Sequence, residues 1–210
     1  YIAGSTKGGL DGNKNKGGEC WFSEEKEECT DTILVKFDSA GTKKWTRQFG
    51  IIGDDSGYGV TTDYLGNIYV TGVTHGGLDG NTSSGESDIF LVKFNSFGKK
   101  LWTKQLGTSS SDWGNSVTTD LSGNIYVTGV TLGGLDGNTS SGESDIFLVK
   151  FNSFGKKLWT RQLGTSGMDR SEGITIDPSG NIYITGITWG VLDGDKNLGK
   201  EDIFLVKFNS

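Results

Sequence analysis

Short apolar runs recur along this chain at a fixed spacing, each in the same polar surroundings. The run Leu-Val-Lys-Phe begins at residues 34, 91, 148 and 205, so each copy lies 57 residues after the previous one. The run Gly-Asn-Ile-Tyr begins at residues 66, 123 and 180, with the same spacing. A fixed period of this length indicates a repeat architecture in which every copy is one supersecondary unit.

Each unit contains four short segments that are rich in β-branched and aromatic residues and bounded by Gly, Asn or Ser, which predicts four strands. In the third unit the predicted strands are residues 116–120, 124–131, 145–152 and 157–164. Two of the connections are tight turns, whereas residues 132–144 and 165–172 form long ones. Because strands alternate in direction, both long connections emerge on one face, here named the long-loop face.

Several predicted strands are apolar on both faces, as in Ile-Tyr-Val-Thr-Gly-Val at residues 125–130. A free-standing sheet would expose one of these faces, whereas a blade between two other blades buries both. A β-solenoid would need shorter repeats, and a sandwich would not need near-identical units. The pattern therefore predicts an all-β fold, a β-propeller of four-stranded antiparallel blades.

The whole chain, residues 1–210, is interpreted as one partial β-propeller. Its repeats lie at approximately 1–53, 54–110, 111–167 and 168–210, with an insertion at approximately 16–30. By analogy with related propellers, the first blade lacks its inner strand and the last lacks its outer strand. An incomplete blade leaves a bare apolar edge. We therefore expect about four blades of a larger propeller, completed by a longer parent chain or, alternatively, by a homo-oligomer.

Composition narrows the class of protein. The chain has 35 Gly, one Pro and 11% aromatic residues in 210, and so many aromatic residues argue against disorder. Its formal net charge of −6 argues against nucleic acid as a partner, because phosphate binding requires clustered Lys and Arg. No apolar run approaches the roughly 20 residues of a membrane-spanning helix.

Three motifs that recur in a fixed order carry a family resemblance. They are Asp-Leu-Ser-Gly-Asn-Ile-Tyr-Val-Thr-Gly at 120–129, Asp-Ile-Phe-Leu-Val-Lys-Phe-Asn at 145–152 and Leu-Trp-Thr-Lys-Gln-Leu-Gly-Thr at 101–108. Together they closely resemble the bacterial β-propeller repeat family abbreviated SBBP, over essentially all of the chain except the insertion. The resemblance implies a propeller, often in large secreted or surface proteins. It implies no common activity, so no catalytic residue is transferred.

The repeats differ in chemical class at a few equivalent positions on the long-loop face. Ser56, Trp113 and Arg170 are equivalent, as are Tyr58, Asn115 and Glu172, and so are Lys7, His75, Leu132 and Trp189. Of these, Tyr58, His75, Trp113 and Trp189 are the candidate ligand-binding residues. Aromatic side chains there would stack on sugar rings or anchor a protein partner, and loop packing is an equally open interpretation.

Carboxylates supply two further hypotheses. The long-loop face is expected to be acidic, since the second repeat offers Asp79, Glu86, Asp88 and Asp112 there. Repeat symmetry would also place Asp55, Asp112 and Asp169 around the mouth of the central channel, where a retaining glycosidase would need two carboxyl groups about 5 Å apart. Identical repeats provide no division into acid and base, and loop-capping aspartates are the simpler interpretation.

A cation site is the next candidate, in the last of four Asp-Gly-Asn/Asp loops. Oxygen ligands at Asp193, Asp195, Asn197 and Asp202 alternate along this loop, which suits a hard cation such as Ca²⁺. The spacing does not match an EF-hand. Asp-Gly and Asn-Gly are also ordinary turn formers whose side chains cap their own backbone, so both interpretations remain open.

The two cysteines, Cys20 and Cys29, both lie in the insertion. Two cysteines make a poor zinc site, and the single histidine, His75, lies elsewhere and argues against a Ser-His-Asp triad. We therefore expect a Cys20–Cys29 disulfide, which suits an oxidising compartment. This expectation favours an extracellular, cell-surface or periplasmic location.

The sequence thus predicts a non-enzymatic, secreted or surface β-propeller that acts as a binding or scaffold module through its long-loop face. Its partner would be a protein or a glycan. Two alternatives remain: a carbohydrate-active enzyme that uses the channel-mouth aspartates, and a purely structural assembly subunit.

Overall fold

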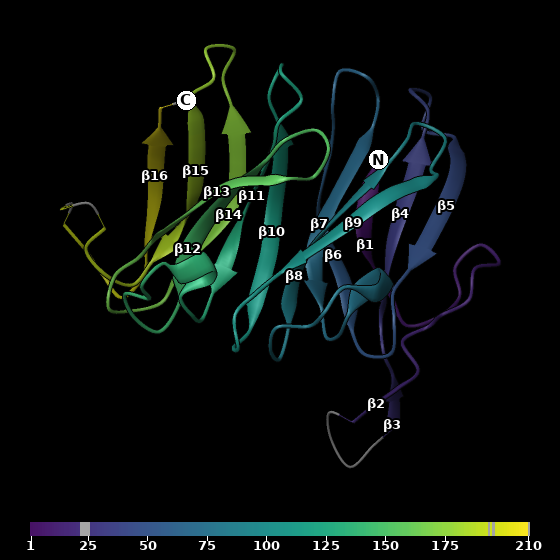
Figure 1. The fold of residues 1–210 in the computed structure, drawn as a ribbon, viewed down its shortest axis with the longest axis horizontal. Coiled ribbons are helices and arrows are strands. Elements are labelled where there is room, and N and C mark those ends of the chain that lie inside the picture. The colour runs from purple at the N-terminus through teal and green to yellow at the C-terminus, as the bar shows by residue number, and fades with distance from the viewer. Residues whose placement is uncertain (22–25, 193, 195, 210) are drawn as a thin grey trace.

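The structure, a computed structural model, describes residues 1–21, 26–192, 194 and 196–209. Antiparallel sheets stand side by side in chain order, as blades do (Figure 1). Blade one consists of β1 (Ile2–Thr6), β4 (Asp31–Phe37) and β5 (Lys43–Phe49). Blade two consists of β6 (Asp55–Thr62), β7 (Ile68–Thr74), β8 (Asp88–Phe94) and β9 (Lys100–Leu106).

Blade three consists of β10 (Asp112–Thr119), β11 (Ile125–Thr131), β12 (Asp145–Phe151) and β13 (Lys157–Leu163). Blade four consists of β14 (Asp169–Ile176), β15 (Ile182–Thr188) and β16 (Asp202–Phe208). These sheets match the predicted fold class and the predicted inventory of three, four, four and three strands. Completion of the end blades by a longer chain or a second copy stays a prediction, as do the repeat boundaries.

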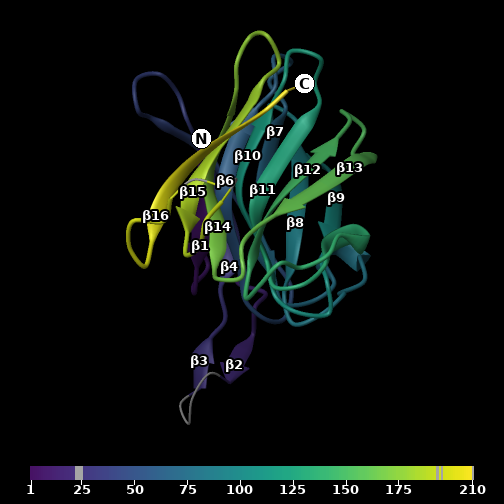
Figure 2. The ribbon, with the colours of Figure 1, turned by 90° about the vertical axis from the view of Figure 1, so that its left-hand side faces the viewer.

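The insertion forms a separate hairpin of β2 (Glu19–Trp21) and β3 (Lys26–Glu28). This hairpin extends beyond the blades in both views (Figures 1 and 2). Two short 3₁₀ turns, Leu78–Gly80 and Leu135–Gly137, lie in the long connections of blades two and three. Each of these turns buries its leucine completely.

Apolar packing between blade faces forms the core. All seven residues of β7 and all seven of β11 are buried, which confirms that these strands are covered on both faces. Ile146 of blade three, for example, belongs to one cluster with Ile182 and Ile184 of blade four. On the outer side of blade four, Ile203 and Leu205 are 87% and 72% exposed, although their equivalents in blade three are fully buried. A blade therefore needs a neighbour on each side to bury its apolar surface.

Polar contacts also cross from blade to blade. The lysine of the Leu-Val-Lys-Phe motif reaches the tight turn of the next blade, because Lys36 Nζ donates to Ser96 O at 3.1 Å and Lys93 Nζ to Ser153 O at 3.0 Å. The first residue of each inner strand is anchored to the preceding blade, as in the 3.0 Å bond from Asp112 N to Ser87 O. These contacts fix the register of one blade against the next.

The inner strands begin earlier than the sequence predicts. The predicted strand 116–120 is part of β10, which starts at Asp112. Asp, Gly and Asn disfavour strands in isolation, so the four residues before Ser116 look like a loop. Gly114 is required there by the fold, since a Cβ at this position would lie 2.4 Å from Thr71 Oγ1 of the preceding blade.

In each of blades one to three, a buried carboxylate occupies the space beside the glycine that directly follows the outer strand. In blade two, Asp88 has no exposed surface and its Oδ2 accepts hydrogen bonds from Ser84 N at 2.8 Å and Gln105 Nε2 at 2.7 Å. A Cβ on Gly107 would lie 1.9 Å from Asp88 Oδ1 and 3.1 Å from Asp112 Oδ2. Glycine at this position therefore leaves room for the carboxylate.

We expect Gly107→Ala to lower the free energy of unfolding by about 3 kcal/mol, because the added methyl group meets a buried carboxylate that cannot move away. Gly4→Ala is the control, since the nearest atom to its Cβ would be Ile33 Cγ1 at 3.8 Å, and its effect should be below about 1 kcal/mol. Denaturant unfolding measures both, and equal stabilities of the two variants would contradict the packing described.

Candidate functional site

An open cavity of about 960 Å³ is lined by the inner strands of blades two to four, together with the ends of second strands and long connections. Three of the four predicted ligand-binding residues, Tyr58, Trp113 and Trp189, line it. The fourth, His75, lines an adjoining cavity of about 420 Å³ that shares Tyr58 and Trp113 with the first. The structure therefore brings the predicted residues together from three blades.

Each of the three complete inner strands has a β-bulge at one position. The pairing register shifts between Gly57 and Gly59 in β6, between Gly114 and Ser116 in β10, and between Ser171 and Gly173 in β14. The extra residue in each bulge does not pair with the neighbouring strand, and a bulge of this kind re-aims its side chain. These extra residues are Tyr58, Asn115 and Glu172, and all three line the larger cavity.

The other two sets of variable positions also face these cavities. Trp113 and Arg170 line the larger cavity, and Ser56 lines the smaller one. At the ends of the second strands, Leu132 and Trp189 line the larger cavity, and His75 the smaller. The repeats therefore differ in chemical class where they meet the cavities.

The aromatic rings of the site are accessible. Tyr58 is 51% exposed and Trp189 is 45% exposed. Partial burial, together with the negative charge of Asp54, raises the pKa of the Tyr58 hydroxyl, so this group is a neutral phenol near neutral pH. Asn115 is held in place, since its Nδ2 donates to Ser171 O of blade four at 2.8 Å.

Charged groups at the larger cavity are mostly carboxylates. Arg170 Nε lies 2.8 Å from Glu172 Oε1 in an exposed ion pair. Glu143 and Glu201 also line the cavity, and neither has an ion-pair partner among the residues that the structure describes. Each of these glutamates lies at the end of the long connection that leads into the third strand of its blade. Sequence reasoning missed these two glutamates and Met168, because residues so far apart in the chain meet only when the blades pack.

The expected acidic long-loop face needs correction. Asp88 and Asp112 have no exposed surface, and Asp79 pairs with Lys100 on the outer strand, with Asp79 Oδ1 at 2.6 Å from Lys100 Nζ. Of the four carboxylates expected there, only Glu86 is exposed and free of a lysine partner, and its Oε2 accepts from Ser111 Oγ at 3.0 Å.

The aspartates expected at the channel mouth are also elsewhere. Asp55, Asp112 and Asp169 have no exposed surface and lie at the junctions between blades. Each carboxylate accepts a hydrogen bond from the backbone four residues earlier, for example Asp55 Oδ2 from Ile51 N at 2.7 Å. They cap the connections into the inner strands, which is the simpler of the two interpretations given for them above.

In the Asp-Gly-Asn loops that the structure describes, the aspartates contact side chains of the protein itself. The carboxylates of Asp11, Asp79 and Asp136 each contact a lysine and a threonine of their own outer strand. Asp193 and Asp195 lie outside the described residues. Asn197 Oδ1 accepts from Gly199 N at 2.9 Å, and Asp202 Oδ2 from Leu198 N at 2.7 Å. Calcium binding at Asp193, Asp195, Asn197 and Asp202 stays a prediction.

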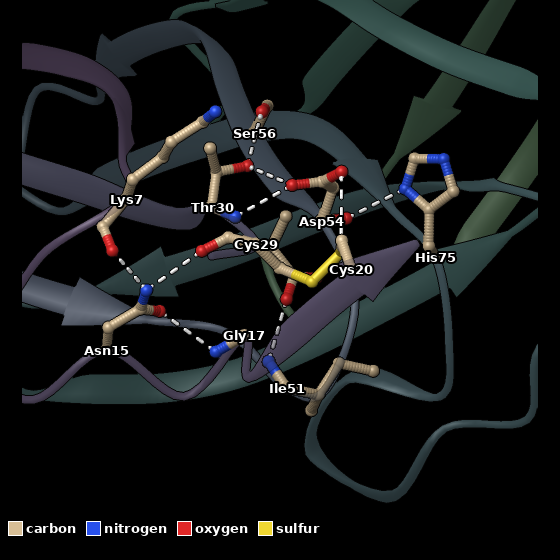
Figure 3. Close-up of a disulfide and its surroundings, with 11 residues drawn as sticks. Lys7, Asn15, Gly17, Cys20, Cys29, Thr30, Ile51, Asp54, Ser56 and His75 are labelled. Atoms are coloured by element: carbon tan, nitrogen blue, oxygen red, sulfur yellow. Dashed lines mark hydrogen bonds between the residues drawn. A yellow bond between two sulfur atoms is a disulfide. The ribbon is translucent and has the colours of Figure 1, made fainter. Parts of the chain in front are cut away.

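The disulfide lies beside residues that line the smaller cavity, among them Thr30, Asp54 and His75 (Figure 3). Cys20 and Cys29 are bonded to each other, with their Cα atoms 5.2 Å apart, as the sequence predicts. Asp54 Oδ1 accepts from Thr30 N at 2.7 Å, and His75 Nδ1 lies 2.8 Å from Asp54 O. Cys20, Cys29 and Asp54 bring potential metal-ligand atoms within 4.8 Å of one another, but the disulfide leaves neither sulfur as a thiolate.

Comparison with known proteins agrees with this architecture. The SBBP family model, a beta-propeller repeat, matches residues 44–79, 101–136 and 158–193. The chain is 26% identical over 88% of its length to an uncharacterized WD repeat-containing protein of Acanthamoeba polyphaga mimivirus. It is 27% identical over 61% of its length to the regulatory protein FlaEY of Caulobacter vibrioides. These matches cover only 16% and 15% of the two relatives.

Helices long and apolar enough to cross a membrane are absent from the part of the chain that the structure describes.

The buried carboxylate of Asp55 predicts a pH dependence of stability. Burial, reinforced by the charge of Asp31, raises the pKa of Asp55 from 3.8 to about 6. Between these two values the folded protein keeps a proton that the unfolded chain has lost. This contribution to stability is therefore complete below pH 3.8 and is lost as the pH rises through about 6.

We expect the melting temperature of the wild type, relative to that of Asp55→Asn, to rise on going from about pH 7 to about pH 5, since the amide cannot titrate. Glu86→Gln, at an exposed carboxylate, is the control and should track the wild type at both pH values. A difference between wild type and Asp55→Asn that does not change with pH would contradict the burial of a protonated Asp55.

Proposed function

Because the chain belongs to the SBBP β-propeller repeat family, we propose that it is a non-enzymatic binding module that holds its ligand in the cavity of the long-loop face. One observation carries this proposal. Residues 67–109 and 124–166 differ only at positions 75/132 and 104/161, and the first of these pairs lines the two cavities. One position that lines the cavities thus differs in chemical class between two repeats that are otherwise almost copies of one another.

Packing alone does not explain this variation. Equivalent positions in a repeat have equivalent neighbours, so a purely structural role favours one residue type at each of them. Instead, the bulges present Tyr58, Asn115 and Glu172, an aromatic, an amide and a carboxylate, to one cavity. Large rigid aromatic rings in a concave surface are typical anchors of binding sites. This arrangement supports a binding module over an inert assembly subunit.

We also propose that the module works outside the cytoplasm, at the cell surface, in the periplasm or in the medium. The Cys20–Cys29 disulfide supports this, since such bonds persist in oxidising compartments.

The aromatic anchors are tested by the double variant Trp113→Ala/Trp189→Ala on a panel of peptides and oligosaccharides. We expect the wild type to bind a member of the panel and the variant to bind it about 30-fold more weakly, because the two rings together would contribute about 2 kcal/mol of binding free energy. The control is Phe154→Ala, whose ring is exposed at a tight turn on the opposite face. Equal losses in the control, or no binding to any member, would contradict the proposal.

The location is tested by the state of the cysteines in protein isolated from its native source without reductant. We expect no reactive thiol in the denatured chain, because both sulfurs are in the bond. Two reactive thiols per chain would remove the argument for an oxidising compartment.

A further inference from the structure

The two cavities share Tyr58 and Trp113, and together they extend past residues of four successive blades; we name them the trough. The larger is lined by residues of blades two to four, the smaller by residues of blades one to three and the insertion, and both include Tyr58 and Trp113. A trough of this shape fits a ligand that is itself a chain, such as a peptide segment or an oligosaccharide. A compact small molecule would fill only one end.

Charge separates these two ligand classes. The one positive group that lines the larger cavity, among the described residues, is Arg170, and it is paired with Glu172 at 2.8 Å. Glu143 and Glu201 are exposed and remain unpaired within the described chain. The larger cavity therefore presents two uncompensated negative charges, in a protein whose formal net charge is −6.

The aromatic rings strengthen the preference for a cation. Trp113 and Trp189 lie in the same cavity as these glutamates, and the face of an indole ring attracts a Lys or Arg side chain. A carboxylate adds a charge-assisted hydrogen bond to the same cation, which is about twice as strong as a neutral bond. A neutral sugar would use the rings but would gain no ionic contact from Glu143 and Glu201.

We propose that the trough binds an extended peptide segment that carries Lys or Arg, with the cation held between the Trp113 and Trp189 rings and the carboxylates of Glu143 and Glu201. This inference rests on the proposed function, because it names the ligand class of the same site. The aliphatic part of a Lys or Arg side chain would pack on Met168 and Leu132, which also line the cavity.

The repeat supplies a matched control. Glu86 is the equivalent of Glu143 one blade earlier, it is also exposed, and it does not line either cavity. Replacement of Glu86 by Gln therefore removes the same charge from the same loop of a neighbouring blade. Any effect of overall charge alone would appear equally in Glu86→Gln and in the single variant Glu143→Gln.

The experiment measures fluorescence anisotropy of labelled Gly-Ser peptides that carry several Lys, several Glu or several norleucine residues, with a neutral oligosaccharide as competitor. We expect the Lys peptide alone to bind and its affinity to fall with added salt, since screening weakens exposed charge pairs. Glu143→Gln should weaken binding about threefold and Glu143→Gln/Glu201→Gln about tenfold, whereas Glu86→Gln should leave it unchanged. Melting temperatures of the variants confirm that each is folded.

Three results would count against the inference. If the oligosaccharide binds and the Lys peptide does not, and Trp113→Ala/Trp189→Ala abolishes that binding, the binding module stands and its ligand class is a glycan. If the Lys peptide binds but Glu86→Gln weakens it as much as Glu143→Gln does, the attraction is that of the whole acidic surface. Absence of binding by every probe would count against both the inference and the proposed function.

Discussion

The burial of one blade face against the next is the interaction on which the rest of this structure depends. Strands β7 and β11 lie at the centre of complete blades and have no exposed residue, whereas β16 at the open end alternates between exposed and half-buried positions. Because every blade must fit the same partner surface on both sides, its apolar positions are fixed by the repeat. The same demand leaves the ends of the inner strands free to vary, since they face the cavities and not another blade.

Much of the fold was predictable because the same weak strand pattern recurs in every repeat at a fixed spacing. A single strand such as residues 145–152 is ambiguous alone, but four copies at one spacing are not. The start of β10 was missed because Asp112, Gly114 and Asn115 have low strand propensity. Asp112 and Gly114 nevertheless pair with Thr131 and Gly129 of β11, and Asp112 N also donates to Ser87 O of blade two. Composition near these residues cannot show this, since their partners lie elsewhere in the chain.

The site was predicted in part. Aromatic residues that differ between equivalent positions pointed to Tyr58, Trp113 and Trp189, and the structure places all three in one cavity. The aspartates were misplaced for a physical reason: an Asp at a strand start looks exposed in the sequence, yet Asp55 and Asp112 are buried where their blade packs against the preceding one. The bulges were not foreseen, because a single extra residue leaves no mark on the apolar pattern.

The bulges also bear on how the binding specificity of such a surface can change. The residue in each bulge takes no part in the strand ladder, so exchanging it alters the cavity without altering the hydrogen bonds that hold the sheet. Each added blade contributes one more bulge side chain to the shared surface. In a repeat array of this kind the strands form a constant scaffold and the bulge residues set the chemistry of the cavity. New binding specificities can therefore arise by substitutions at a few positions and by exchange of whole blades.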